Sequence, residues 1–198
     1  MYKLKIISST VRPGRKGPKI AAWVADTVRR DGRFQVEVLD LGDTNLPLMN
    51  EAAHPVLKQY EHEHTKRWSE KIEEADAFIF VTAEYNFGYP SALRNALEYL
   101  VQEWAYKAAG IVSYGGVSAG TRAANSLRAD LTTLRVVPVY EMVNLPFFAQ
   151  FINDLQEFVP SEVTQKAAEA MLNELFRWTK GMKLIKENKE TALNTLGV

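Results

Sequence analysis

The sequence contains no cysteine among its 198 residues. That absence excludes disulfide bonds, thiolate zinc sites, iron–sulfur clusters and cysteine nucleophiles. An excess of charge of one sign is also lacking, because 24 Lys and Arg side chains balance 24 Asp and Glu side chains. Nucleic-acid and membrane surfaces need clustered positive charge, so we expect neither partner. No apolar run approaches the roughly 18 residues of a membrane-spanning helix. The short apolar start lacks a signal-peptide pattern, so we expect a cytoplasmic protein.

What is present is an alternation of strand-like and helix-like hydrophobic patterns. Such alternation is typical of an α/β domain with a parallel sheet and helices on both faces. Five strands suit a doubly wound sheet of order 2-1-3-4-5. Pro138 cannot donate to a strand ladder, so the last strand should lie at an edge. We expect a single domain over residues 1–198 with a frayed polar tail over 183–198. The predicted strands cover 3–8, 34–41, 77–82, 110–114 and 136–140, and the helical stripes cover 20–28, 57–75, 93–104, 123–134 and 163–182.

In this strand order, ligands bind beyond the carboxyl ends of the strands, where the first and third strands meet. The first loop at that edge, residues 9–18, precedes a helix whose free N–H groups attract anions. Gly17 suits the helix cap and Pro18 the first helical position. The loop therefore predicts a phosphate site, with a solvated basic turn as the alternative. It matches neither GxGxxG nor GxxxxGK[ST], so it signals neither a dinucleotide Rossmann site nor a P-loop. Its hydroxyl and basic side chains are Ser9, Thr10, Arg12, Arg15, Lys16 and Lys19.

The second loop, residues 83–90, places aromatic side chains at Tyr85, Phe87 and Tyr89. Backbone amides at a strand end, beside aromatic faces, suit a flat heteroaromatic ligand with polar edges. The alternative is an aromatic turn packed on its neighbours. In the third loop, residues 115–121, glycines let the backbone approach a ring closely. A GGxSxG turn alone has low specificity, but its place after the fourth strand supports a role at the ligand site.

The stretch EYNFGYPSALRNALEYL, residues 84–100, resembles the signature of the NADPH-dependent FMN reductase family. The usual form is Pro-Glu-Tyr-Asn, two variable residues, then Pro and a helix with Leu-Lys-Asn-Ala. This chain has Ala83 for the Pro and Arg94 for the Lys. The resemblance extends over roughly residues 3–140 and includes the element order. It implies a flavodoxin-like fold, FMN as cofactor, and NADPH or NADH as co-substrate.

The resemblance also implies site residues. Ser9 and Arg12 match the family's Gly-Ser-x-Arg-x-x-Ser loop around the FMN phosphate, whereas Arg15 replaces the later Ser. A guanidinium can hold a phosphate bidentately, so Arg15 stays a candidate. The second and third loops should contact the flavin ring through main-chain groups. The expected cofactor-binding set is Ser9, Arg12, Arg15, Gly17, Pro18, Glu84, Tyr85, Asn86, Phe87, Gly115, Gly116 and Ser118.

These expectations describe an enzyme that passes hydride from NAD(P)H to FMN and then to a small acceptor. A quinone, an azo or nitro compound, a metal oxyanion and free flavin all remain open. Donor and acceptor should share one cleft shaped by the second-loop aromatics, which predicts ping-pong kinetics. We name no catalytic side chain, since flavin chemistry depends on positioning. The alternatives are a flavodoxin-type electron-transfer protein and a binding protein that has lost its cofactor. Zero net charge argues against the carrier, because flavodoxins are commonly acidic.

Two further patterns concern metals and assembly. His62 and His64 are two positions apart, and such side chains do not face each other on a helix, so we expect no metal site. Tyr99, Trp104 and Tyr106 follow the apolar stripe of the helix after Pro90. Aromatic residues are enriched at interfaces. Together with the resemblance, they predict a homodimer or homotetramer whose subunits meet near the flavin.

Overall fold

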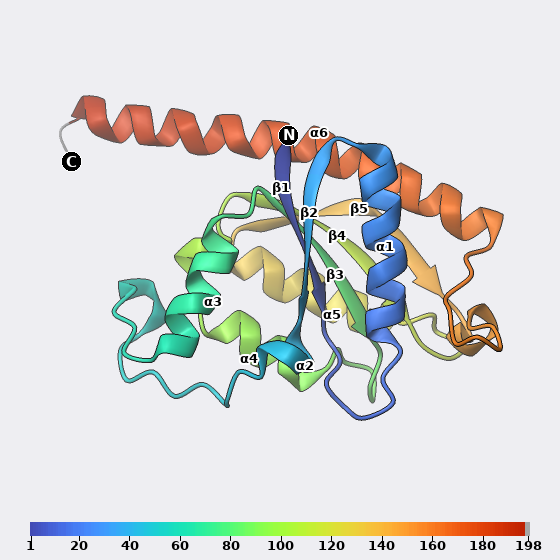
Figure 1. Cartoon of the computed structure of the whole chain (residues 1–198). Helices are drawn as coiled ribbons and strands as arrows, with labels where there is room; N and C mark the ends of the chain where they lie inside the picture. The colour runs from blue at the N-terminus through green and yellow to red at the C-terminus, as the bar shows by residue number, and fades with distance from the viewer. Residues whose placement is uncertain (197–198) are drawn as a thin grey trace.

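Five parallel strands form the centre of the molecule (Figure 1). The computed structural model describes residues 1–196, and their side chains as far as residue 188. The strand order β2-β1-β3-β4-β5 confirms the predicted flavodoxin-like sheet. β3 and β4 are buried along their whole length, as strands covered on both faces should be. The strands are β1 (Tyr2–Ser8), β2 (Phe34–Asp40), β3 (Ala77–Ala83), β4 (Lys107–Tyr114) and β5 (Val136–Leu145).

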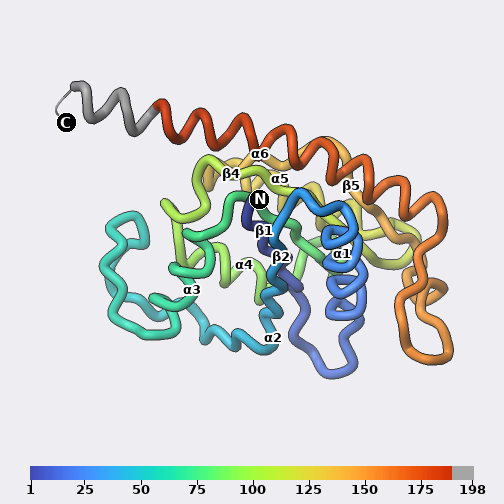
Figure 2. Tube along the Cα trace, turned by 45° about the horizontal axis from the view of Figure 1, so that its top comes forward, coloured from blue at the N-terminus to red at the C-terminus, as the bar shows by residue number. Residues whose placement is uncertain are grey.

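Helices cover both faces of the sheet, as Figures 1 and 2 show. On one face lie α1 (Gly17–Asp31) and α6 (Glu162–Leu196). On the other face lie α3 (Glu63–Glu73), α4 (Ser91–Glu98) and α5 (Thr121–Thr133). Short helical turns complete the chain: α2 (Leu41–Thr44), η1 (Pro55–Leu57), η2 (Gln102–Trp104) and η3 (Phe148–Phe151).

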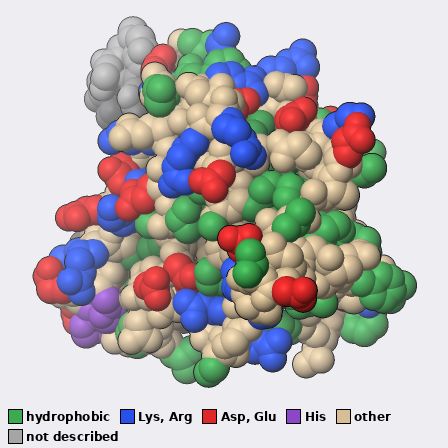
Figure 3. Space-filling model, turned by 45° about the vertical axis from the view of Figure 1, so that its right-hand side comes forward, with side chains coloured by type: hydrophobic (Ala, Val, Ile, Leu, Met, Phe, Trp, Pro, Cys, Tyr) green, Lys and Arg blue, Asp and Glu red, His purple; other side chains and the backbone are tan. Residues whose placement is uncertain are grey.

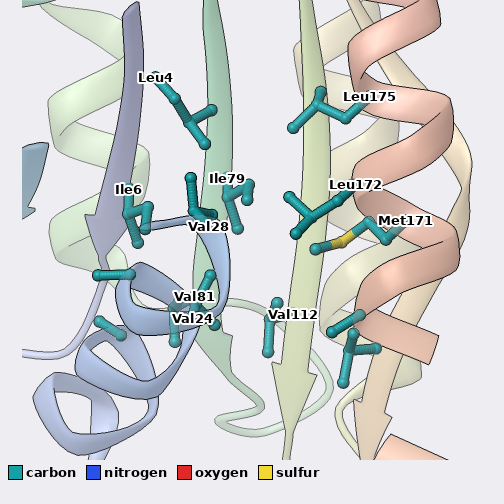
Figure 4. Packing of buried hydrophobic residues seen from close by; sticks show 14 of the residues in the cluster. Leu4, Ile6, Val24, Val28, Ile79, Val81, Val112, Met171, Leu172 and Leu175 are labelled. Carbon is teal, nitrogen blue, oxygen red and sulfur yellow. The ribbon is translucent and has the colours of Figure 1, made fainter. Parts of the chain in front are cut away.

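The alternation of side chains along each central strand supplies one hydrophobic core to each face. Figure 4 shows Ile79 and Val81 of β3 beside Val24 and Val28 of α1, with Leu172 of α6 packed farther along the sheet. Phe78 and Phe80, the intervening residues of β3, point to the other core. Burying one such side chain stabilises the fold by roughly 1.5–3 kcal/mol. The two cores therefore fix the sheet rigidly and leave its carboxyl edge to the loops.

The edge position of β5 confirms the expectation drawn from Pro138. The helix expected over 57–75 begins only at Glu63, because Pro55 starts a 3₁₀ turn and Lys58 adopts a left-handed φ of 52°. Where we expected a frayed tail, α6 continues to Leu196, while residues 197 and 198 lie outside the described part. No helix within residues 1–196 is long and apolar enough to cross a membrane.

The aromatic residues after α4 pack differently from what the sequence suggested. Tyr99 and Trp104 are fully buried within the chain, where the Trp104 ring lies 5.0 Å from that of Phe78. The interface argument is wrong for these two side chains, because η2 folds the chain back onto the core after α4. His62 also differs: it precedes α3 with an extended backbone, and its ring stacks on His64 at 5.1 Å.

Candidate functional site

The three loops chosen from the sequence meet at the carboxyl edge of the sheet. Parallel strands bring the ends of β1, β3 and β4 together, and hydrogen bonds join the loops that leave them. The Ser9 amide donates to the Val81 carbonyl at 3.1 Å, and the Glu84 amide donates to the Tyr114 carbonyl at 3.0 Å. The predicted location therefore forms one continuous surface.

The hydroxyl groups of Ser8, Thr10 and Tyr114 surround Gly17 and form a cradle between the ends of β1 and β4 and the start of α1. The hydroxyls of Ser8 and Ser9 are buried and have no hydrogen-bond partner within the described residues. A Cβ atom on Gly17 would lie 2.5 Å from the Thr10 hydroxyl and 3.0 Å from that of Tyr114, so the close approach of these hydroxyls to the start of α1 requires glycine at this position. Unpartnered buried donors are rare and call for a ligand or water. The first loop fits a phosphate.

The start of α1 differs by one residue from the expected cap. Lys16 is the N-cap, and Gly17 and Pro18 are the first two helical residues. The Lys16 cap makes no side-chain hydrogen bond, Pro18 has no N–H, and the Lys19 amide donates to the Lys16 carbonyl at 3.1 Å, so the Gly17 amide is the helical donor left for an anion in the first turn. Burial raises the pKa of Tyr114 to about 12, which keeps its hydroxyl protonated at neutral pH.

The two arginines of the first loop have different surroundings. Arg12 is exposed, and its guanidinium lies 5.8 Å from the centroid of the Tyr85 ring in the second loop. Arg15 points to the end of β2, where Nη2 lies 3.1 Å from Asp40 and 3.6 Å from Asp43. The charge of Arg15 is therefore already balanced, whereas Arg12 makes no ion pair within the described residues.

The second loop is a strained hairpin turn. Tyr85 and Gly88 exchange backbone hydrogen bonds of 2.8 and 3.0 Å. Asn86 and Phe87 between them both have positive φ, 49° and 70°, as in a type I′ turn. A bulky residue in that conformation costs of order 1–3 kcal/mol, and such strain clusters at functional sites. In the described structure the amides of Asn86 and Phe87 have no acceptor, so they can face the polar edge of a ligand.

The aromatic side chains of this turn divide between two surfaces. Phe87 is 68% exposed and Tyr85 39% exposed, so both rings are open to a ligand. The hydroxyl of Tyr89 instead donates to Asp130, beside a hollow of about 450 Å³ that Leu48 and Arg94 also line. Tyr89 thus belongs to a neighbouring depression beyond Gly88.

Glu84 is oriented differently from the rest of the turn. Its side chain is 9% exposed and accepts from the Ser118 hydroxyl at 2.8 Å, the Arg122 guanidinium at 3.0 Å and the Arg122 amide at 3.2 Å. Burial acts to raise the pKa of Glu84, but these hydrogen bonds and the charge of Arg122 outweigh it and hold the pKa below its usual value. Glu84 is therefore a carboxylate bound to the start of α5.

The third loop lies between this carboxylate and residues 146–160. Gly115 and Gly116 accept backbone hydrogen bonds from Phe148 and Phe147, at 3.2 and 3.0 Å. Gly120 has a φ of 78°, and a Cβ there would lie 2.6 Å from the Tyr114 amide, so the turn requires glycine at this position.

Hydrophobic and charged side chains are interspersed on the face that Figure 3 brings forward.

Sequence reasoning included Gly120 in the third-loop glycine pattern and missed Arg122 and Phe147. Arg122 lies beyond that loop, and its guanidinium is 4.2 Å from the Phe87 ring centroid. Phe147 is 60% exposed next to Gly116, and no motif marked it. No cluster of His, Asp or Glu within the described residues could hold a metal ion.

Comparison with known proteins identifies the family of the chain. The NADPH-dependent FMN reductase family matches residues 2–150. An NAD(P)H-dependent FMN reductase of Schizosaccharomyces pombe is 41% identical over 147 residues, 73% of this chain and 74% of the relative. Another from a Nectria species is 37% identical over 182 residues, 86% of this chain and 89% of the relative.

Among solved structures, the flavoenzyme NAD(P)H:(acceptor) oxidoreductase FerB of Paracoccus denitrificans has a TM-score of 0.75 at 21% identity. The match covers 92% of this chain and 99% of FerB, and it supports the fold. The sequence matches favour an enzyme over the electron-carrier alternative. The chain belongs to the NADPH-dependent FMN reductase family and is an oxidoreductase whose redox groups are FMN and NAD(P)H.

Proposed function

We propose that the three loops hold FMN and that the enzyme passes electrons from NAD(P)H to a small flat acceptor of the quinone type. The observation that carries the proposal is the pair of buried and unpartnered hydroxyls of Ser8 and Ser9, of which the Ser8 hydroxyl belongs to the cradle around Gly17. It suits a phosphate ester in a chain that lacks both nucleotide-binding glycine fingerprints.

The proposed phosphate contacts come from the first loop. Ser9 and Thr10 contribute hydroxyls, and Gly17, followed by Pro18, contributes the open start of α1. Arg12 contributes unbalanced positive charge. Arg15 is the second candidate, since a phosphate would have to draw it away from Asp40.

The proposed ring contacts come from the other two loops. The free amides of Asn86 and Phe87 would donate to the polar edge of the flavin ring, and the side chains of Tyr85 and Phe87 supply an apolar surface beside it. Gly115 and Gly116 allow close backbone approach. Ser118 acts through Glu84 and not on the ring itself, because its hydroxyl donates a hydrogen bond to Glu84.

Bound FMN supplies hydride acceptance from NAD(P)H and electron donation to the acceptor. The chain's contribution is to hold donor and ring in near-attack geometry and to shape the apolar wall of the cleft. Glu84 stays ionised and engaged with Arg122, and Tyr114 stays protonated, so neither side chain is placed to relay a proton at neutral pH. The exposed rings of Tyr85 and Phe87 favour flat acceptors.

Leu48, Phe87 and Val117 are exposed apolar side chains of the loops at this edge. Burying them against a second copy would remove apolar surface from water. We therefore propose a homodimer whose subunits meet near the flavin. Light scattering at micromolar concentration tests it, and a single species of monomer mass would contradict it.

The purified enzyme tests the main proposal directly. It should be yellow, and anaerobic NADPH or NADH should bleach the flavin without another protein. Turnover with a panel of quinone, azo, nitro, metal-oxyanion and flavin acceptors should be fastest with quinones. Bleaching that requires a separate reductase protein would favour the electron carrier, and fastest turnover with any acceptor of the panel other than a quinone would contradict the acceptor class.

A further inference from the structure

One carboxylate joins two of the loops that surround the proposed flavin site. Glu84 follows β3, Ser118 lies in the third loop, and Arg122 belongs to the first turn of α5. Both oxygens of Glu84 are used: Oε1 accepts from the Ser118 hydroxyl and the Arg122 guanidinium, and Oε2 accepts from the Arg122 amide. We call these three residues the Glu84 cage.

Arg122 extends the cage to the tip of the second loop. Its guanidinium lies 4.2 Å from the centroid of the Phe87 ring while it also binds Glu84. The cage therefore holds the turn of residues 85–88 at two points, before its first residue and at its tip. Charge-assisted hydrogen bonds of this kind are about twice as strong as neutral ones.

The turn has a physical need for such restraint. Phe87 adopts a φ of 70°, and a bulky side chain leaves that conformation readily unless its surroundings oppose the change. Within the turn, two backbone hydrogen bonds between Tyr85 and Gly88 provide support. The free amides of Asn86 and Phe87 keep a common direction only while the turn keeps its shape.

We propose that Glu84 is a positioning residue: with Ser118 and Arg122 it holds the strained turn in the shape that receives the flavin ring, without contacting the ring itself. This inference rests on the proposed flavin site. The cage prepares the turn before the ligand arrives, so less of the binding free energy is spent on ordering it.

The variant Glu84→Gln removes the charge and keeps the size. It should weaken FMN binding about 10-fold or more, since hydrogen bonds to a charged group are lost. The cage acts on the ring end of the site, so riboflavin, which lacks the phosphate, should be weakened by the same factor. Arg12→Ala should instead weaken FMN and leave riboflavin nearly unchanged.

Fluorescence titration of the apoproteins measures these affinities, and thermal unfolding checks that each variant folds. Glu98→Gln is the matched control, because Glu98 is an exposed carboxylate on α4 that pairs with Arg94. It should bind both flavins as the parent does. Ser118→Ala removes one hydrogen bond and should weaken both flavins by roughly threefold to tenfold.

A rescue experiment separates positioning from general support of the fold. Phe87→Gly creates the Asn-Gly sequence that type I′ turns prefer and removes the strain. In that background Glu84→Gln should weaken FMN binding by less than about threefold, because the turn holds its own shape. The same weakening in both backgrounds would overturn the inference.

Unchanged FMN affinity in Glu84→Gln would also overturn the inference. A loss of FMN affinity with unchanged riboflavin affinity would overturn it as well. Failure of the parent protein to bind either flavin would instead overturn the proposed flavin site. The two failures are therefore distinguishable.

Discussion

Gly17 is the position where one added methyl group tests the phosphate cradle. In Gly17→Ala the new Cβ would lie 2.5 Å from the Thr10 hydroxyl, 3.0 Å from that of Tyr114 and 3.2 Å from that of Ser8. Gly17 has no positive φ, so alanine fits its backbone. The Thr10 hydroxyl is the atom that must give way, and it lies 3.4 Å from the Tyr114 hydroxyl.

Two effects on stability oppose each other in this variant. Alanine favours a helix over glycine by up to about 1 kcal/mol, and by less at the first helical residue. Overpacking a filled space costs about 1–3 kcal/mol. The net change should therefore be destabilising, on the order of 1 kcal/mol, which lowers the melting temperature of a chain of this size by about 2–4 °C.

The effect on FMN should be larger, because the methyl group occupies the cradle itself. Loss of one hydrogen bond to the charged phosphate weakens binding about 10- to 100-fold. Calorimetric titration of FMN into the apoproteins measures the affinity. Gly181→Ala is the control: Gly181 lies in α6 with no heavy atom within 4 Å of its added Cβ. It should stabilise the protein by roughly 0.5–1 kcal/mol and leave FMN binding unchanged. Equal FMN affinity in Gly17→Ala and the parent, with a rise in melting temperature like that of Gly181→Ala, would refute the cradle.

The remaining predictions concern charge, pH and kinetics. Arg12→Ala should weaken FMN binding about 10- to 100-fold. Arg15→Ala should change it by less than about threefold, because the Arg15 guanidinium is already paired with Asp40 in the parent. FMN titration of both apoproteins measures the affinities, and a larger loss in Arg15→Ala would assign the phosphate to Arg15. Burial lowers the pKa of Lys107 to about 7, and in the unfolded chain lysine titrates near its ordinary value of about 10.4. Between these two values the unfolded state binds more protons than the folded state, so the free energy of unfolding of the parent should rise as the pH increases. From pH 7 to pH 10 this rise should exceed that of Lys107→Met by about 4 kcal/mol. Urea unfolding measures both proteins, and parallel curves of unfolding free energy against pH would contradict the prediction. Varying NAD(P)H and a quinone together should give parallel double-reciprocal lines, since one cleft serves both, and intersecting lines would indicate a ternary complex.

The fold could be predicted because its determinants are local. β3 is apolar at every position, which identifies a strand covered on both faces. Pro138 marks the edge through its missing N–H group. The helix expected over 57–75 shows where hydrophobic periodicity fails to predict a helix. Tyr60 supports a helical period, yet it lies before α3 and its hydroxyl donates to the buried Glu103 at 2.8 Å. Its apolar contacts come from tertiary packing and not from helical spacing.

Strand order predicts which loops come together at the candidate site, but it does not predict the side-chain pairings among them. Asp40 caps α2 by accepting from the Gly42 amide at 2.8 Å, a role that its place at a strand end allows, but its ion pair with Arg15 has no signal in the sequence. Glu84 belongs to the aromatic motif and turns instead to Arg122, which lies 38 residues later. Which charged groups meet across two loops depends on the tertiary arrangement, and no spacing rule in the sequence encodes it.

The contrast between buried strands and exposed turn side chains has a consequence for how the protein can change. Phe87 and Val117 are 68% and 76% exposed, so they contribute little to the hydrophobic stabilisation of the sheet beneath them. Substitutions there can accumulate without approaching the stability threshold that purges core mutations. On the proposed site, libraries built at Phe87 should therefore yield mostly folded proteins with altered acceptor preferences.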